Sequence, residues 1–392
     1  MHINASSTTL YGPESTALHI AAAQGDVEIV RVLLAAGATV ETHQNPSLLL
    51  AAERGHVKVI QLLLETGPST SSLGFDYGVL LSATDSVEMV QLLLEPKWGI
   101  DINKKYQVAR YREAAPLCHA VMRGNFDVVR ALLDAGAFVD TIDQDMHTPL
   151  VMATSKGNLD VVRTLLEAGA NLRYNGGEML GTPLMMAETP EMVQLLLEPT
   201  WGLGVNELIK WPAWYHGNGP ETTAMHSVAR IGNGRVLRAL QEAGAVVDAL
   251  DSDMRTPLAI AVASGRIEAA RVLLEAGGCA AHAGTKGKGR EQPSPLEDVG
   301  SAEMVRLLLE PAWGLEVNKL ISNSYAGWVW EATALHFNAA KGNDGVVRAL
   351  LDCGAIVDSL DENLETPLIY AINSYHCVDV ARALLEAGAD AF

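Results

Sequence analysis

At 392 residues the chain is longer than one hydrophobic core usually supports, so its length predicts two or three domains or one elongated stack. Apolar residues make up 48% of the chain and aromatic residues 5%, which indicates a core of Leu, Val, Ile and Ala. The formal net charge of -19 repels phosphate backbones and anionic lipid surfaces, so we expect neither nucleic acid nor membrane as a partner.

Residues 1–14 form a short leader ahead of the first repeat. Its first ten residues are polar and have no signal-peptide pattern, and no run of about 18 uncharged apolar residues occurs in the chain. The cysteines lack metal-ligand spacing and are interpreted as reduced thiols; they are Cys118, Cys279, Cys353 and Cys377. These features favour a cytoplasmic or nuclear location.

From Ser15 onward, one pattern recurs about every 33 residues. It begins with Thr-Ala-Leu-His at residues 16–19, continues with Gly25 and a Leu-Leu pair at residues 33–34, and ends with Gly-Ala at residues 37–38. The threonine predicts an N-cap, Gly25 separates two short helices, and the last glycine ends the second helix. Because one helix pair cannot bury its apolar face alone, neighbouring pairs must stack.

The pattern returns as Thr-Pro-Leu at residues 148–150, 256–258 and 366–368, and it resembles the ankyrin repeat over nearly the whole chain. The resemblance implies an all-α solenoid of about eleven helix–turn–helix units, and ankyrin proteins usually bind other proteins. The units are expected to begin near Ser15, Ser47, Phe75, Ala114, His147, Gly181, Glu221, Arg255, Pro293, Glu331 and Glu365.

A second period of about 105 to 110 residues lies on top of the first. The segment Glu-Met-Val-Gln-Leu-Leu-Leu-Glu-Pro-Lys-Trp-Gly at residues 88–99 returns in similar form at residues 191–202 and 303–314. We therefore expect a three-unit module present three times. The predicted division is two N-terminal units at residues 15–74, followed by modules at residues 75–180, 181–292 and 293–392.

The leading unit of each module differs from the other units in two ways. Its first helix is shorter, so the stack is expected to kink or open there. Pro96, Pro199 and Pro311 then replace the usual Ala-Gly helix ending. Each proline is followed by a Trp-Gly pair and an insert, at residues 104–113, 207–221 and 319–331.

All seven tryptophans fall in these three segments. Trp98, Trp201 and Trp313 occupy equivalent positions and are interpreted as structural plugs against the altered helix end. Large rings on long loops of a rigid scaffold are typical of binding sites, although the inserts could equally cap only their own local cores. The expected ligand or partner groove consists of Lys105, Tyr106, Arg110, Tyr111, Arg112, Trp211, Trp214, Tyr215, His216, Tyr325, Trp328 and Trp330.

Three other groups of residues favour structural interpretations. The resemblance implies that His19, His226 and His336 bond to the backbone near the Thr cap. The aspartates at residues 140–145, 248–253 and 358–361 predict turn caps, because no bidentate Glu stands at calcium-loop spacing. No metal and no cofactor are expected. Where the family pattern places a glycine after the turn Asp, this chain has Met146, Met254 and Leu364, so either the turn conformation differs or these side chains face a partner.

Two functions are weighed. The first is a scaffold that binds a protein or peptide through its concave groove and aromatic inserts. The second is a binder of a hydrophobic small molecule, or a cofactor-independent cyclase or isomerase, in which the rings shape a pocket and His216 or Tyr215 acts as acid and base. Open, exposed aromatic inserts favour the first, and inserts folded into a pocket favour the second.

Overall fold

The computed structural model describes residues 7–9, 12–39, 46–66, 78–107, 113–173, 182–210, 221–279, 295–297, 299–325, 328–374 and 377–391. The chain divides into two compact segments, Met1–Pro183 and Leu184–Phe392. We call them the N-terminal and C-terminal segments, and each is described by itself.

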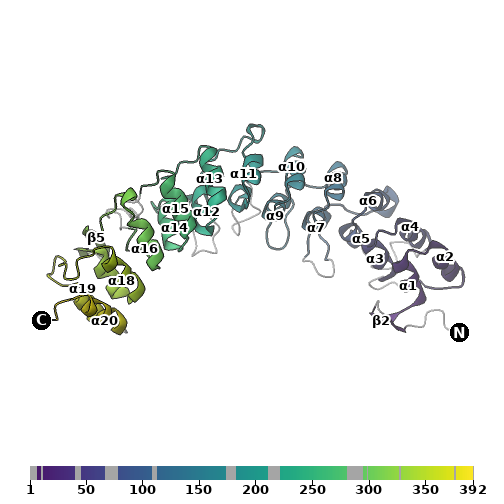
Figure 1. The fold of residues 1–392 in the computed structure, drawn as a ribbon. Coiled ribbons are helices and arrows are strands. Elements are labelled where there is room, and N and C mark those ends of the chain that lie inside the picture. The colour runs from purple at the N-terminus through teal and green to yellow at the C-terminus, as the bar shows by residue number, and fades with distance from the viewer. Residues whose placement is uncertain are drawn as a thin grey trace. The chain divides into compact units, whose positions relative to one another are not determined.

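The N-terminal segment is built from pairs of antiparallel helices, which are visible for α7 to α10 in Figure 1. A short strand pair, β1 (Ser7–Thr9) and β2 (Gly12–Ser15), precedes the first helix. The helices are α1 (Ala17–Gln24), α2 (Val27–Ala35), α3 (Pro46–Glu53), α4 (Val57–Thr66), α5 (Gly78–Ala83), α6 (Val87–Leu93), α7 (Pro116–Arg123), α8 (Phe126–Asp134), α9 (Pro149–Ser155) and α10 (Leu159–Glu167). The 3-10 turn η2 (Pro96–Trp98) follows α6.

The C-terminal segment continues the same pattern of pairs. Its helices are α11 (Pro190–Leu196), α12 (Ala224–Ile231), α13 (Gly234–Glu242), α14 (Pro257–Ala263), α15 (Ile267–Glu275), α16 (Ala302–Leu308), α17 (Ala334–Lys341), α18 (Asp344–Asp352), α19 (Pro367–Asn373) and α20 (Val378–Glu386). Its 3-10 turns are η3 (Pro183–Met186), η4 (Pro199–Trp201) and η6 (Pro311–Trp313). Two strand pairs lie among the helices, β3 (Ile209–Lys210) with β4 (Glu221–Thr222), and β5 (Ile321–Tyr325) with β6 (Trp328–Ala332).

Helices pack in two rows, one of first helices and one of second helices. In the N-terminal segment α1, α3, α5, α7 and α9 contact one another in order, as do α2, α4, α6, α8 and α10. In the C-terminal segment α11, α13, α15, α16, α18 and α20 form the row of second helices. Each pair therefore buries its apolar side chains against the next pair, and the predicted all-α solenoid is confirmed.

The core consists of Leu, Val, Ala and Met, as the composition indicates. Val128 and Leu132 of α8 and Leu165 of α10 are fully buried. None of the described helices combines the length and the apolarity that crossing a bilayer requires. The helix ends also follow the sequence, because Thr148 accepts a hydrogen bond from the backbone N–H of Val151 at the start of α9.

The predicted shortening of the leading first helices is confirmed. Helix α5 has six residues, η3 has four in a 3-10 turn, and residues 295–297 form only a turn in the third module. The expected kink or opening of the stack at these places stays a prediction, and so do the number of units, the module boundaries and the super-repeat.

The second and third inserts contain strands, which we did not expect. Strands β5 and β6 pair antiparallel from Ile321 opposite Ala332 to Tyr325 opposite Trp328. The reason is visible in the sequence, because Trp-Val-Trp and Ile-Ser-Asn-Ser-Tyr are rich in the aromatic and β-branched residues that suit a pleated surface. In the first insert, a single bridge joins Tyr106 and Ala114.

Candidate functional site

The histidines of the Thr-x-Leu-His pattern have the structural role that we expected. The backbone N–H groups of Thr16, Thr223 and Thr333 donate to Nδ1 of His19, His226 and His336, at 3.0, 3.2 and 3.2 Å. Nδ1 is therefore an acceptor, so the neutral ring carries its proton on Nε2. In His336 this Nε2 donates to the carbonyl oxygen of Glu365 at 3.0 Å.

Burial keeps two of these rings neutral. Desolvation lowers the pKa of both His226 and His336 below the ordinary value of 6.5, against hydrogen bonds to carbonyl oxygens that raise it. Both ring nitrogens of His336 are engaged in the neutral form, so its imidazole has no free position for acid–base chemistry. A catalytic or metal-binding role for this set is not supported.

The aspartates cap turns, as predicted. Asp143 Oδ1 accepts from the backbone N–H of Asp145 at 2.9 Å and of His147 at 2.8 Å. Asp361 Oδ1 accepts in the same way from Asn363 and Glu365, at 2.9 and 2.7 Å. The Asp143, Asp145 and His147 side chains lie close enough to share an ion, but the backbone bonds already explain the position of Asp143.

The same turns end in left-handed residues with apolar side chains. Met146, Met254 and Leu364 have φ values of 63°, 63° and 64°, a region that L-residues rarely adopt. The family-type turn is therefore kept, although no glycine stands there. Leu364 is 73% exposed, so its side chain gains little burial in return for the backbone strain. We call Met146, Met254 and Leu364 the fingertip residues.

Asparagine side chains attach the start of each insert to the following unit. In the third module, Ile356 N donates to Asn318 Oδ1 at 2.8 Å, and Asn318 Nδ2 donates to the carbonyl oxygen of Gly354 at 3.0 Å. Asn206 binds Val246 and Gly244 in the same way. Asn103 does so with Phe138 and Gly136, which completes the set of three modules. We did not single out these asparagines from the sequence.

The second strand of the insert, β4 in the second module and β6 in the third, also contacts the following unit. The contact is made with the turn that ends in a fingertip residue, which we call the finger. Ser252 N donates to the carbonyl oxygen of Glu221 at 3.0 Å, and Glu221 N donates to Ser252 Oγ at 3.0 Å. In the third module, Glu362 N donates to Glu331 O at 3.3 Å. In the second and third modules, the insert and the following finger are therefore joined at both ends of the insert.

Large apolar side chains stand exposed along this joined edge. In the third module they are Leu320, Ile356, Leu360 and Leu364, and in the second module Leu208, Val246 and Leu250. Phe138, which follows the first insert, is 68% exposed. We call an insert, its following finger and these side chains the module edge.

The predicted groove residues have different outcomes. Tyr106 is buried, and its hydroxyl donates to the carbonyl oxygen of Asp101 at 2.8 Å, so our placement of its ring on the partner surface was wrong. The bridge to Ala114 turns its ring against Gly78. Lys105 is exposed on the same insert.

The other predicted groove residues can be placed only in part. Tyr325, Trp328 and Trp330 lie in β5 and β6, where the backbone alone is described. Seven lie outside the described residues, namely Arg110, Tyr111, Arg112, Trp211, Trp214, Tyr215 and His216.

The tryptophans predicted to be plugs are half-buried. Trp98, Trp201 and Trp313 each end a 3-10 turn, followed by a glycine in the left-handed region. Their Nε1 atoms are buried, with no hydrogen-bond partner within the described part of the chain. The half-buried rings are consistent with plugs at the altered helix end.

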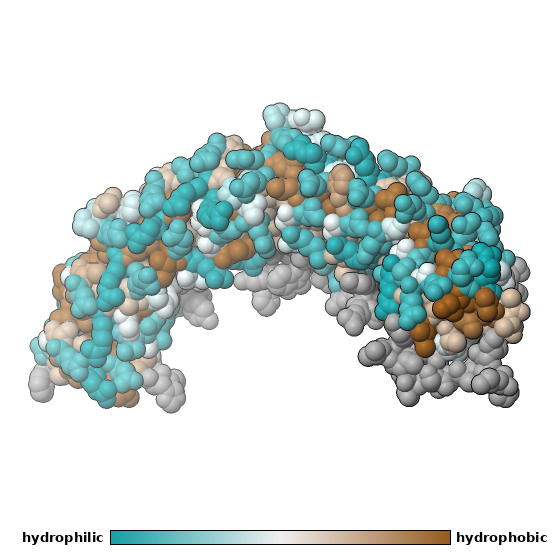
Figure 2. Space-filling view, turned by 45° about the vertical axis from the view of Figure 1, so that its right-hand side comes forward, coloured by the Kyte–Doolittle hydropathy of each residue, from teal (hydrophilic) through white to brown (hydrophobic). Residues whose placement is uncertain are grey.

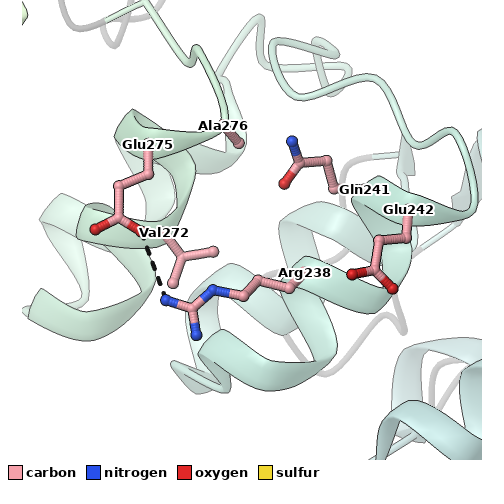
Figure 3. A pocket seen from close by; sticks show the side chains of 6 residues that line it. All are labelled: Arg238, Gln241, Glu242, Val272, Glu275 and Ala276. Carbon is pink, nitrogen blue, oxygen red and sulfur yellow. Dashed lines mark ion pairs between the residues drawn. The ribbon is translucent and has the colours of Figure 1, made fainter.

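A surface hollow of about 310 Å³ lies between α13 and α15, and Figure 3 shows the six residues that line it. Its wall is mostly polar, and Arg238 Nη2 lies 3.5 Å from Glu275 Oε2 across it. No predicted site residue lines it. This ion pair joins the second helices of two neighbouring pairs. We therefore attribute the hollow to the packing of α13 against α15.

Cys118 is a buried thiol, and burial raises its pKa to about 12. A thiol that is protonated at neutral pH is a poor nucleophile. The free cysteines Cys118, Cys279, Cys353 and Cys377 agree with the expectation of reduced thiols.

A family model described as ankyrin repeats, in three copies, matches the chain at residues 2–73, 79–176, 117–207, 186–283 and 297–392. The matches cover most of the sequence, including both compact segments.

Proposed function

The chain belongs to the ankyrin repeat family, and from this premise we propose that it is a scaffold that binds a protein partner through its module edges. Ankyrin repeats generally serve as protein-interaction scaffolds. The observation that carries the finer proposal is the repeated attachment of each insert to the following unit, by Asn103, Asn206 and Asn318. It fixes the start of each insert against the following unit, which lowers the entropy cost of binding.

The exposed side chains of the module edge support a protein as the partner. Ile356 and Leu360 are 57% and 51% exposed, and they lie in the loop that ends at Leu364. Apolar side chains grouped on an otherwise charged surface are typical of interaction sites. The aromatic residues of the inserts would add large, stiff contact groups beside them. We propose that the partner also contacts the concave groove of the repeat stack.

The partner is expected to tolerate or complement negative charge. The finger of the third module carries Asp358, Asp361, Glu362 and Glu365 around its apolar residues. Basic residues near the apolar contact groups of the partner would therefore speed association and improve specificity.

A photo-cross-linking amino acid at Ile356 tests this proposal in an extract of the source cells. The matched control carries it at Gln241, which is also exposed but lies on α13. We expect a discrete protein adduct at position 356 and none at 241. Once the adduct is identified, the wild-type chain without a cross-linker should bind that protein and Ile356→Asp should not. Equal adducts at both positions, or none at 356, would refute the edge as the binding surface.

No described feature favours the alternative, a small-molecule binder or a cyclase or isomerase. The residues that it would use for acid and base, Tyr215 and His216, lie outside the described residues.

A further inference from the structure

Helix α2, the second helix of the first pair, exposes apolar side chains at positions that are buried in most of the other second helices. Ile29 is 47% exposed, whereas its counterparts Val128, Val161, Val236 and Val346 are fully buried. Val32 is 66% exposed, and its counterpart Ala349 is fully buried. Figure 2 shows an apolar, brown patch at the N-terminal end of the chain, on the right of the view. We call Glu28, Ile29 and Val32 the N-face.

The last helix pair exposes a different set of positions. Ile372 of α19 is 68% exposed, whereas its counterparts in six other first helices are at most 1% exposed; they are Ala22, Val121, Thr154, Ala229, Val262 and Ala339. Leu385 of α20 is 48% exposed, whereas its counterparts Leu166 and Leu274 are buried and Leu133 and Leu351 are half-buried. We call Ile369, Ile372, Arg382 and Leu385 the C-face.

The two faces are the two sides of one type of interface. In the first pair, Ala22 occupies the repeat position of Ile372 of the C-face and is buried, whereas Ile29 of the N-face is exposed. In the last pair the burial is reversed, because Val380 at the N-face position is buried and Ile372 is exposed. The N-face positions therefore pack on a preceding pair and the C-face positions on a following pair. Inside each segment every such contact joins a C-face to an N-face.

The charges on the two faces also match those of an internal contact. Between α13 and α15, Arg238 Nη2 lies 3.8 Å from Glu268 Oε1. In the repeat, Arg382 occupies the position of Arg238, and Glu28 occupies the position of Glu268. Both side chains are exposed, with fractions of 59% for Arg382 and 81% for Glu28. Arg382 pairs with Asp379 and Glu28 pairs with Arg31, each within its own helix.

We propose that a second copy of this chain docks its C-face on the N-face, with Ile372 and Leu385 packed against Ile29 and Val32 and with Arg382 beside Glu28. The contact repeats an interface that the chain already forms internally, so no new type of packing is required. It joins two different surfaces, and each dimer keeps one N-face and one C-face. Every open oligomer formed in this way keeps one free face of each kind, so association continues with concentration, and pairing of two like faces is excluded. This inference is independent of the module edge.

Sedimentation velocity of the full chain and two blocked variants tests the proposal. Ile29→Glu blocks the N-face and Ile372→Glu blocks the C-face, because each places a charge in the apolar contact. The wild type should grow beyond a dimer as its concentration rises, and each variant alone should stay monomeric. An equimolar mixture of the two should form dimers and nothing larger, through the one intact face of each. Ile231→Glu is the control and should associate like the wild type, because Ile231 is 51% exposed on α12 and belongs to neither face.

Exchange of the two charges provides a second, independent measurement. Glu28→Arg and Arg382→Glu should each weaken association, and the double variant should recover it, because the pair is restored with reversed sign. A wild type that is monomeric at every concentration would overturn the proposal. So would a mixture of blocked variants that stays monomeric, or a blocked variant that still dimerises alone. Circular dichroism of each variant identifies unfolding, and in that case Ile29→Ser and Ile372→Ser replace the charged substitutions.

Discussion

The left-handed fingertip residues allow the cost of backbone strain to be measured directly. Replacing Leu364 by glycine removes the Cβ that makes this conformation unfavourable, which is a gain of about 1–2 kcal/mol. Glycine loses about 0.5–1 kcal/mol more than other residues through backbone entropy. Because the Leu364 side chain is 73% exposed, little burial is lost. We expect a net stabilisation of about 0.5–1 kcal/mol.

The assay is urea unfolding, with the midpoint and slope fitted to the transition that contains the last helix pairs. Leu364→Ala is the matched control, because alanine keeps the Cβ while removing the rest of the side chain, and its stability should lie close to that of the wild type. If Leu364→Gly unfolds at the same urea concentration as Leu364→Ala, or a lower one, the strain argument is wrong. If the glycine variant is more stable but loses the cross-linked partner, the leucine is present for binding at the expense of stability.

Two further predictions concern buried residues. Gly78→Ala should destabilise the N-terminal segment by about 1–3 kcal/mol, because the added Cβ would overlap the Tyr106 ring, and thermal unfolding will measure this loss. Stability should also fall as the pH drops below about 6.5, because burial lowers the folded-state pKa of His336 and the unfolded chain then binds more protons. His336→Gln should flatten this slope, by at most about 1.4 kcal/mol per pH unit, between pH 7.5 and 5.5; an unchanged slope would contradict the assignment.

The sequence predicts the repeat well because its signals are local. A threonine cap and the first turn of helix that it binds lie within three residues of each other, as for Thr148 and Val151. The short leading helices were equally predictable, because they follow from the spacing between a leucine of the first helix and a glutamate of the second, as between Leu80 and Glu88. Burial by the neighbouring pair then follows from the repeat itself.

The candidate site was less predictable because its contacts are distant in sequence. Asn318 reaches Gly354 across 36 residues, and its sequence context resembles that of any loop asparagine. Asn318 is a contact residue that we missed, whereas Tyr106 is a buried residue that we wrongly predicted to face a partner. An aromatic residue in an insert looks available for binding, but the backbone bridge to Ala114 decides which way the ring points. Which face of a short strand is buried depends on its register, and register is set by pairing.

The second unit of a module contacts both the shortened helix and the insert of the leading unit. The last carbonyl groups of every helix need partners from outside the helix, and in a leading unit the second unit provides them. Arg123 supplies them in the first module, donating to Ser82 O at 2.6 Å and to Thr84 O at 2.7 Å. In the third module Asn338 Nδ2 donates to Leu296 O and Lys341 Nζ to Glu297 O, at 2.9 and 2.7 Å.

The second unit of a module therefore completes the first unit twice, once at the short helix and once at the insert through Asn103, Asn206 or Asn318. A leading unit without its follower would have unpaired carbonyls and an unattached insert. It follows that the leading unit together with its follower is the smallest part of this chain that can present an ordered edge to a partner. Duplication of the proposed binding surface then requires duplication of at least these two units, and the three-unit period that we predict from the sequence contains both.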